Sequence, residues 1–405
     1  MNTTRAWYQA ELGNRASLWA SAFLLAAIYA GSTIVTPLYP LYQRAFGVSE
    51  VTITLVYATY VVGNLGALFA FGRVSDQAGR RVVSLLVLAV GGASTLLFLF
   101  AVHPAMLFLA RAASGLAIGV GAATATAWIA DLHPNADKAD ASRLAAAVNL
   151  VGLAVGVFIS GMLARYAPSP LRLVYAIYLL VLLITTAVIA RTRETVDSPA
   201  REGKEGISLK PRIGIAPQAR MAFIAPAVTA LATFALLGFY AALAPNLLAN
   251  SMHLRSPAVS GAIVAELFAA SAVAVVAAPM IAPRVTMFIG LWLLAPSLAL
   301  LLWAQFAGSL AWLIAATALC GIASAFGFRG SLQEVNRIAP AERRAEMLSA
   351  YLLCCYGGNS LPAVGVALLS RQIGHLWADV AFAGVLVGLG AIALIVGARW
   401  GRSES

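Results

Sequence analysis

Charge is scarce in this chain of 405 residues, of which only 11% are charged. Ordinary soluble domains carry about a quarter charged residues, so the composition excludes that class. Cysteine and histidine are also rare, with three and four residues, and no pair of histidines has metal-ligand spacing. The sequence also lacks a glycine-rich loop ending in Lys-Ser or Lys-Thr, which excludes ATP as an energy source within this chain. We therefore expect no disulfide framework, metal or cofactor, and no enzyme activity.

Hydrophobic residues, in contrast, make up 61% of the chain, and its mean hydropathy is +0.86. Apolar stretches of 18 or more residues recur throughout, and each is long enough to cross a hydrocarbon core of roughly 30 Å as a helix. We expect the first stretch to be a span and not a cleaved signal. The fold class is thus an all-α membrane protein, with twelve spans predicted near residues 17–41, 51–72, 82–101, 105–130, 144–166, 171–190, 221–243, 258–281, 285–304, 308–330, 346–369 and 376–398.

The basic residues predict the orientation of these spans. Placing both termini in the cytoplasm puts 21 of the 27 lysines and arginines on the cytoplasmic side. Such an excess is what the positive-inside rule describes, so we expect a multi-pass protein of a bacterial-type inner membrane with both termini inside. The basic residues are spread over short loops that face an anionic leaflet, and no basic face is concentrated for phosphate binding. The high pI of 10.0 therefore does not indicate a nucleic-acid partner.

The chain divides into two halves that resemble each other. The longest polar interval, residues 191–220, follows the sixth span and is rich in proline, glycine and mixed charges. Small and turn residues recur at a constant offset of 206 positions across it, pairing Gly115 with Gly321 and Gly152 with Gly358. We predict two pseudo-symmetric six-helix bundles at residues 1–190 and 221–405, joined by a cytoplasmic linker at 191–220. Parallel repeats of this kind place a substrate site near the membrane midplane, between the two halves.

The turn between the second and third spans carries the most informative motif. It contains Gly72, Asp76, Gly79, Arg80 and Arg81 in the order Gly-x-x-x-Asp-x-x-Gly-Arg-Arg. This pattern resembles the loop signature of the major facilitator superfamily. The resemblance implies a twelve-helix transporter that works by alternating access on small molecules.

Two further motifs lie in the fourth and fifth spans. Leu107-x-x-x-Arg111-x-x-Ser114-Gly115 resembles the fourth-helix pattern of the drug:proton antiporters in this superfamily, with Ser114 in place of the usual glutamine. The segment from Gly152 to Leu163, which includes Gly156 and Gly161, is similar to their fifth-helix pattern, with Val157 replacing a proline and Ser160 a glycine. The resemblance implies export. The glycines Gly115, Gly152, Gly156 and Gly161 are expected to permit close helix packing, with a structural role as reasonable as a gating one.

Ionisable residues inside spans point to the mechanism. An ionisable side chain at the centre of a span costs roughly 2.5–3.5 kcal/mol on insertion scales, so it normally faces a cavity or a partner. Arg111 and Glu266 lie deep in opposite halves. A carboxylate whose surroundings change between two conformations can take up and release a proton, so Glu266 is the candidate proton carrier. The alternative is that both residues only hold neighbouring helices together.

The resemblance also implies a gate latch on the cytoplasmic side. In the family, the loop aspartate caps a helix of the second half, and the loop arginine pairs with an acid at the end of the fourth helix. The matching residues here are Asp76, Arg80 and Asp131, supported by Gly72, Gly79 and Arg81. Contacts of this kind, each worth roughly 0.3–1 kcal/mol at a helix N-terminus, can bias a conformational equilibrium. The alternative is a solvated basic loop.

Polar and aromatic residues within the spans outline a cavity. The first span contains no acid, which argues against a broad exporter of cations, and the aromatic character suggests a mid-sized, partly apolar substrate. Taken singly, each aromatic is better explained by membrane packing or an interfacial belt than by substrate contact. The candidate cavity residues are Tyr39, Tyr57, Tyr60, Asn64, Asn149, Phe234, Tyr240, Tyr351, Tyr356 and Asn359.

These observations predict a monomeric, proton-coupled exporter of a small organic molecule. Two alternatives stay open. One is a proton-coupled importer of a metabolite, which could be an anion with Arg111 as its counter-ion. The other is a sensor or scaffold that has a transporter fold but does not transport. The expected partners are a small-molecule substrate, protons and the lipid bilayer.

Overall fold

The computed structural model describes residues 11–71, 74–134, 137–196, 213–277 and 281–400. Within these ranges twelve helices are long and apolar enough to cross a membrane, which confirms the all-α fold with twelve spans. Short 3-10 turns η2 (Thr36–Leu38), η4 (Pro217–Ala219) and η5 (Ala341–Arg343) adjoin them. The α-helices are α1 (Asn14–Thr33), α2 (Tyr39–Phe46), α3 (Glu50–Phe71), α4 (Val74–Ala78), α5 (Arg80–Leu99), α6 (Pro104–Leu132), α7 (Lys138–Tyr166), α8 (Pro170–Ile189), α9 (Arg220–Ser251), α10 (Pro257–Ala277), α11 (Pro283–Phe306), α12 (Leu310–Ile338), α13 (Arg344–Ile373) and α14 (His375–Trp400).

Proline marks where several of these helices begin. Pro104, Pro170, Pro257 and Pro283 each open a helix, where the missing N–H group is not needed and the fixed φ suits the first turn. Several helices also extend past the apolar stretches that predicted them. For example, α12 continues to Ile338, eight residues beyond the predicted span that ends at 330, because polar residues can extend a helix into the aqueous boundary.

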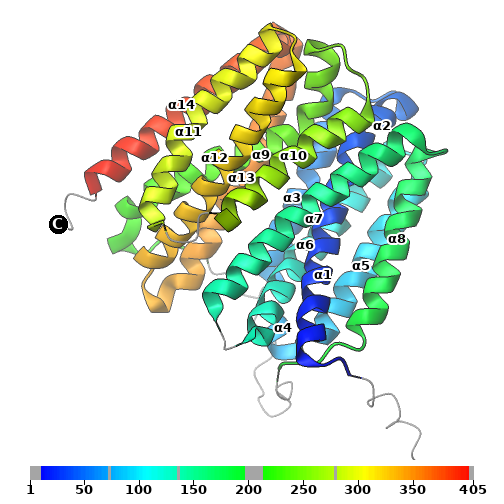
Figure 1. The fold of residues 1–405 in the computed structure, drawn as a ribbon, viewed down its shortest axis with the longest axis vertical. Coiled ribbons are helices and arrows are strands. Elements are labelled where there is room, and N and C mark those ends of the chain that lie inside the picture. Colours follow the sequence, from blue (N-terminus) through cyan, green and yellow to red (C-terminus); the bar gives the residue numbers. More distant parts are fainter. Residues whose placement is uncertain (1–10, 72–73, 135–136, 197–212, 278–280, 401–405) are drawn as a thin grey trace, which may run out of the picture.

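The helices form two bundles that lie side by side (Figure 1). In the first bundle α3 packs against α6 and α1 against α7, and in the second α11 packs against α12 and α9 against α13. The bundles contact each other mainly through two pairs, α7 with α10 and α3 with α13. We call the side that holds the start of α1, the short helix α4 and the end of α14 the terminal face. The opposite side, which holds α2, is the distal face.

Apolar packing joins the two bundles most extensively at the distal face, and a small cluster between α10 and α7 continues it toward the terminal face. The cluster of buried residues at the distal face includes Leu38 and Tyr42 of the first bundle together with Leu243 and Phe268 of the second. Toward the terminal face each bundle has clusters of its own, such as the one around Trp128 in the first bundle and the one around Met347 in the second. The two halves are therefore held together more tightly at the distal face.

The start of the predicted linker packs against the first bundle. The backbone N–H of Leu12 donates to the carbonyl of Arg191 at 2.8 Å, and the indole of Trp128 donates to the carbonyl of Arg193 at 3.0 Å. Residues 197–212, the middle of that linker, lie outside the described residues. The domain boundaries at 190 and 220 stay a prediction.

Candidate functional site

Arg111 of α6 is completely buried, with an exposed fraction of 0%. Its Nη1 donates to the carbonyl of Ser32 at 2.9 Å, and its Nη2 donates to the hydroxyl of Tyr39 at 2.6 Å. Ser32 lies in the last turn of α1, where carbonyl groups lack helical partners, and the chain then turns through η2 into α2, which begins at Tyr39. The end of α1 and the start of α2 thus provide both acceptors of the guanidinium.

Three tyrosine rings surround the same guanidinium. Its central carbon lies 5.9 Å from the ring centroids of Tyr39 and Tyr57 and 5.5 Å from that of Tyr60. These distances suit cation–π attraction, which strengthens when the cation is shielded from water. Arg111 forms no ion pair with any carboxylate of the described residues, and its Nε atom has no hydrogen-bond partner there. A carbonyl, a hydroxyl and aromatic faces therefore stabilise this buried charge without an acid.

A close approach of α3 to α6 places the tyrosines over Arg111. A Cβ atom added to Gly115 of α6 would lie 2.1 Å from the carbonyl oxygen of Tyr60, so only glycine allows this contact. The repeat has the same feature, because a Cβ atom on Gly321 of α12 would lie 2.4 Å from the carbonyl oxygen of Leu267 in α10. The offset seen in the sequence therefore corresponds to an equivalent helix crossing in each half.

Polar side chains from both bundles meet next to this cluster. The amide of Asn64, exposed by only 1%, lies beside the phenols of Tyr60 and of Tyr356, which belongs to α13 in the second bundle. Tyr57 lies beside Asn359 of α13. On the other side, Tyr29 of α1 lies beside Asn149 of α7. The predicted cavity residues Tyr39, Tyr57, Tyr60, Asn64, Asn149, Tyr356 and Asn359 thus gather around the boundary between the halves.

Aromatic rings continue this boundary into the second bundle. Phe234 of α9 lies 5.2 Å from Phe328 and 6.0 Å from Tyr356, measured between ring centroids. Phe328, which the sequence analysis did not select, also stacks at 6.4 Å on Tyr351. Tyr240 lies apart from this group, in the buried cluster of the distal side, where its hydroxyl is 3.1 Å from that of Thr317.

Glu266 does not approach Arg111 in this structure. It is half-buried on α10, and among the described residues it makes neither a hydrogen bond nor an ion pair. It lies in the neighbourhood of Tyr240, whereas the contacts of Arg111 come from α1, α2 and α3. The two deep ionisable residues therefore occupy separate surroundings.

At the terminal face, Arg80 is the centre of a cluster of polar contacts. Its guanidinium pairs with Asp76, donates to Ser75 Oγ at 2.8 Å and pairs with Asp131 Oδ2 at 3.2 Å. Asp131 ends α6, and its Oδ2 atom also accepts a hydrogen bond from the hydroxyl of Thr195 at 2.9 Å. The predicted pairing of Arg80 with Asp131 is present.

Asp76 differs from the role that the resemblance implied. It pairs with Arg80 inside its own bundle, and among the described residues it makes no hydrogen bond to a helix of the second half. Arg81 pairs instead with Glu11 at 3.3 Å, and Gly72 lies outside the described residues. Every described contact of this cluster belongs to the first bundle, which is consistent with the separate apolar clusters of the two halves at this face.

Glu194 is a member of this cluster that the sequence analysis missed. Its two carboxylate oxygens accept hydrogen bonds from the backbone N–H groups of Arg80 and Arg81, both at 2.9 Å. These groups open α5, where a carboxylate satisfies unpaired donors and interacts favourably with the helix dipole. The acid follows α8 by five residues but lies more than a hundred positions from Arg80. In the sequence, its place beside two arginines in the segment Arg-Thr-Arg-Glu at 191–194 was the only signal of a polar cluster.

Gly79 makes this cap possible, and its substitution gives a first prediction. Its φ is +94°, and an added Cβ atom would lie 2.8 Å from Glu194 Oε2. Gly79→Ala should therefore destabilise the protein by about 1–3 kcal/mol, the typical cost of a strained backbone position. Thermal unfolding of the purified protein would measure this. Gly92→Ala is the matched control, because this glycine of α5 has no atom within 4 Å of the added Cβ. Equal melting temperatures for the two variants would contradict the argument.

The remaining predicted packing glycines lie at close helix contacts. Added Cβ atoms on Gly152 and Gly156 of α7 would lie 2.5 and 2.4 Å from carbonyl oxygens of Ala26 and Ala30 in α1. Gly161 differs, because it faces the second bundle. Its added Cβ atom would lie 2.7 Å from the carbonyl oxygen of Pro257 and 3.0 Å from the Cα atom of Gly261, both on α10.

Comparison with known sequences identifies the family. A sequence profile of the Major Facilitator Superfamily matches residues 21–362. The chain belongs to the Major Facilitator Superfamily. It is therefore a membrane transporter and not an enzyme, as the loop motif and the composition predicted. A mutant of the nucleoside transporter NupG has the same fold, with a TM-score of 0.74, 13% identity, and coverage of 95% of this chain and 100% of that one.

Two drug-resistance proteins are distant relatives of this superfamily member. The puromycin resistance protein pur8 of Streptomyces alboniger is 32% identical over 152 residues, which are 36% of this chain and 30% of that protein. The quinolone resistance protein NorA of Staphylococcus aureus is 24% identical over 143 residues, 35% of this chain and 37% of that protein. The alignments thus span about a third of each relative. They support the predicted relationship to drug efflux proteins.

Proposed function

We propose that this transporter exports a small organic molecule in exchange for protons, by alternating access. The observation that carries the proposal is the fully buried Arg111, which has no carboxylate partner among the described residues and lies next to the boundary between the two halves. Ionisable residues within spans are costly and are usually kept for function. The distant relationship to pur8 and NorA, both named as resistance proteins, supports export.

The same cluster suggests the chemistry of the substrate. The side chains around Asn64 include phenols from both bundles. Glu266, the acid that the sequence analysis selected, lies near Tyr240 instead. Both polar atoms of the Asn64 amide and the Oδ1 atom of Asn149 are buried without a well-formed hydrogen bond. Buried polar groups are normally satisfied, so a ligand that supplies these bonds would gain affinity. We expect a neutral or anionic substrate with an aromatic ring and several hydrogen-bonding atoms.

Roles for the other candidate residues follow from this scheme. Glu266 carries the proton, because its carboxylate lacks a fixed partner and α10 belongs to the pair of helices that joins the halves. Asp76, Arg80, Arg81 and Asp131 form the latch, with Gly79 shaping its turn. Gly115, Gly152 and Gly156 hold helices together within the first bundle, and Gly161 acts between the bundles. The protein works as a monomer in the inner membrane, with both termini in the cytoplasm.

Transport in reconstituted vesicles tests this proposal. Puromycin and a quinolone are reasonable first probes, given the names of the two relatives. A proton gradient imposed across the vesicle membrane should drive accumulation of a transported probe on the side with more protons. Glu266→Gln should remove the gradient-driven accumulation while exchange of labelled for unlabelled probe continues, because the neutral amide cannot carry a proton. Glu342→Gln, at an exposed acid of the terminal face, is the matched control.

One observation favours a second function, the import of an anionic metabolite. The guanidinium of Arg111 has no carboxylate partner among the described residues, and it could act as the counter-ion of an anionic substrate. In the same vesicles, accumulation of a probe on the side with fewer protons, toward which protons flow, would support import by co-transport with protons. Gradient-driven accumulation that is unaffected by Glu266→Gln would reject Glu266 as the proton carrier in either direction.

A further inference from the structure

A second group of titratable side chains lies at the distal face, away from Arg111 and Glu266. Its centre is Asp379 in the second turn of α14, with an exposed fraction of 6%. The side chain lies beside Gln305 of α11 and Glu50 of α3. Asp379 forms no ion pair with a lysine or arginine of the described residues. It is thus a buried acid with a second acid beside it and no permanent cation to neutralise it.

The helix α14, which carries Asp379, packs against α9, α11 and α13 of the second bundle. The hydroxyl of Ser251, the last residue of α9, donates to the Oε1 atom of Gln305 at 3.0 Å. This bond occupies the amide oxygen, and the buried amide nitrogen of Gln305, which lies near the carboxyl group of Asp379, has no hydrogen-bond partner among the described residues. Arg371, at the end of α13, which also packs against α14, is exposed and does not pair with Asp379. The side chains that α9 and α11 provide here, Ser251 and Gln305, are thus uncharged, and His375, four residues earlier on α14, is the titratable neighbour along the same helix.

The acid beside Asp379, Glu50, belongs to the first bundle. Glu50 is the first residue of α3, and its Oε2 atom lies 3.9 Å from the Nδ1 atom of His375, the first residue of α14. Glu50 and His375 therefore contact each other across the boundary between the halves. Separation of the halves at the distal face would remove Glu50 from both His375 and Asp379.

Protonation stabilises the arrangement in two ways. Repulsion between the carboxylates of Asp379 and Glu50 disappears when one of them binds a proton, and a neutral acid tolerates burial far better than a charged one. Both effects favour the conformation in which the halves are packed together at the distal face.

We propose that Asp379 and Glu50, with His375 in contact with Glu50, form a proton-binding site that closes the distal side of the transporter. Binding of protons holds the halves together there, and their loss allows the halves to separate. The apolar cluster around Leu38 and Phe268 lies between this site and the terminal face, so its protons exchange with the distal side. The site senses pH on that side and does not carry protons across the membrane. With the termini in the cytoplasm, it senses external acid.

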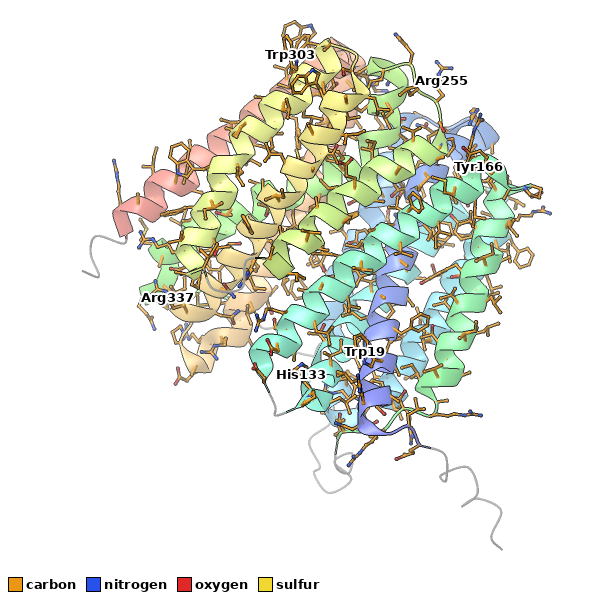
Figure 2. The ribbon with its side chains drawn as sticks, viewed as in Figure 1. Trp19, His133, Tyr166, Arg255, Trp303 and Arg337 are labelled. Carbon is orange, nitrogen blue, oxygen red and sulfur yellow. The ribbon has the colours of Figure 1, made fainter. Side chains whose placement is uncertain are left out.

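Distance measurements between spin labels test this proposal without any substrate. Tyr166 of the first bundle and Trp303 of the second are both exposed at the distal face (Figure 2), so Tyr166→Cys and Trp303→Cys provide label positions. The native Cys320, Cys354 and Cys355 would be replaced by serine in the full-length protein. Pulsed electron paramagnetic resonance in lipid nanodiscs would then give the ratio of closed to open molecules. We expect this ratio to fall at least about tenfold from pH 5 to pH 8, within the limit of tenfold per pH unit for one linked proton.

Variants assign the effect to these residues. Asp379→Asn and Glu50→Gln imitate protonated acids, so both should stay closed at either pH. Glu342→Gln at the terminal face should respond like the parent protein. Glu266→Gln should also keep the pH response, which separates this site from the proposed proton carrier.

A pH-independent distance in the parent protein would overturn the proposal, and so would a full response in Asp379→Asn. If Asp379→Asn fails to fold, as thermal unfolding would reveal, Glu50→Gln on the other bundle decides, because its side chain is less buried. The distances need no transported molecule. Failure of proton-coupled export in vesicles would therefore leave this result standing, and the reverse also holds.

Discussion

Arg111→Lys is expected to abolish most transport, although it keeps the positive charge. The guanidinium of Arg111 donates at once to the carbonyl of Ser32 and the hydroxyl of Tyr39, and its flat face lies against tyrosine rings. An ammonium group is compact and strongly hydrated, so it cannot reproduce these two hydrogen bonds together with the stacking of a planar group. Hydrogen bonds to charged groups contribute about 1.5–3 kcal/mol each. Loss of one such bond lowers a rate by roughly tenfold or more, and loss of both by roughly a hundredfold or more.

Initial transport rates in vesicles, together with probe binding to the purified protein, would measure this effect. Tyr39→Phe removes only one of the two bonds and should have the smaller effect. Arg165→Lys is the matched control, because Arg165 is an exposed arginine at the distal end of α7. A lysine variant that transports at the parent rate would show that only the charge of Arg111 matters.

The sequence predicted the membrane fold well because the bilayer imposes a simple rule on it. A span needs about twenty apolar residues, and long apolar stretches are visible without any knowledge of tertiary structure. The turn motif around Gly79 and Arg80 then identified the superfamily. Helix ends were less accurate, as α12 shows, because polar residues at the membrane boundary continue a helix without continuing the apolar stretch.

The partners of Arg111 could be predicted from the sequence only in part. Its position deep in a span and the choice of Tyr39, Tyr57 and Tyr60 as cavity residues could be predicted separately, since each lies within a predicted span. Their meeting depends on the turn after Thr33 and on the close crossing at Gly115, which are properties of the folded backbone. Hydrophobicity patterns carry no information about such a crossing.

Glu194 and Asp379 were missed for different reasons. Glu194 caps α5 from a position 114 residues away, and no local pattern connects it to that helix. Asp379 lies inside the last predicted span, so its position alone could have marked it as a costly buried acid. Its significance depends on Glu50, which belongs to the other half of the chain and lies beside it only in the folded protein.

Gly161→Leu is expected to hold the halves apart at the distal face. The added side chain would meet backbone atoms of Pro257 and Gly261, which cannot turn aside as a flexible side chain can. Overpacking of this kind typically costs about 1–3 kcal/mol. Because the cost falls only on the conformation in which α7 and α10 touch here, it should shift the conformational equilibrium by roughly 5–150-fold toward separation. Transport should fall strongly, since one state of the cycle becomes rare.

The contact is reciprocal, which provides an independent test. A Cβ atom on Gly261 would lie 2.8 Å from the carbonyl oxygen of Val157 and 2.9 Å from the Cα atom of Gly161, so Gly261→Leu should produce the same shift from the other bundle. Gly365→Leu, at an exposed glycine of α13 with no atom within 4 Å, is the matched control. Spin-label distances across the distal face would separate these outcomes. Unchanged distances in both Gly161→Leu and Gly261→Leu would mean that α7 and α10 can adjust within their own bundles, and the two glycines would then have no role in opening this face.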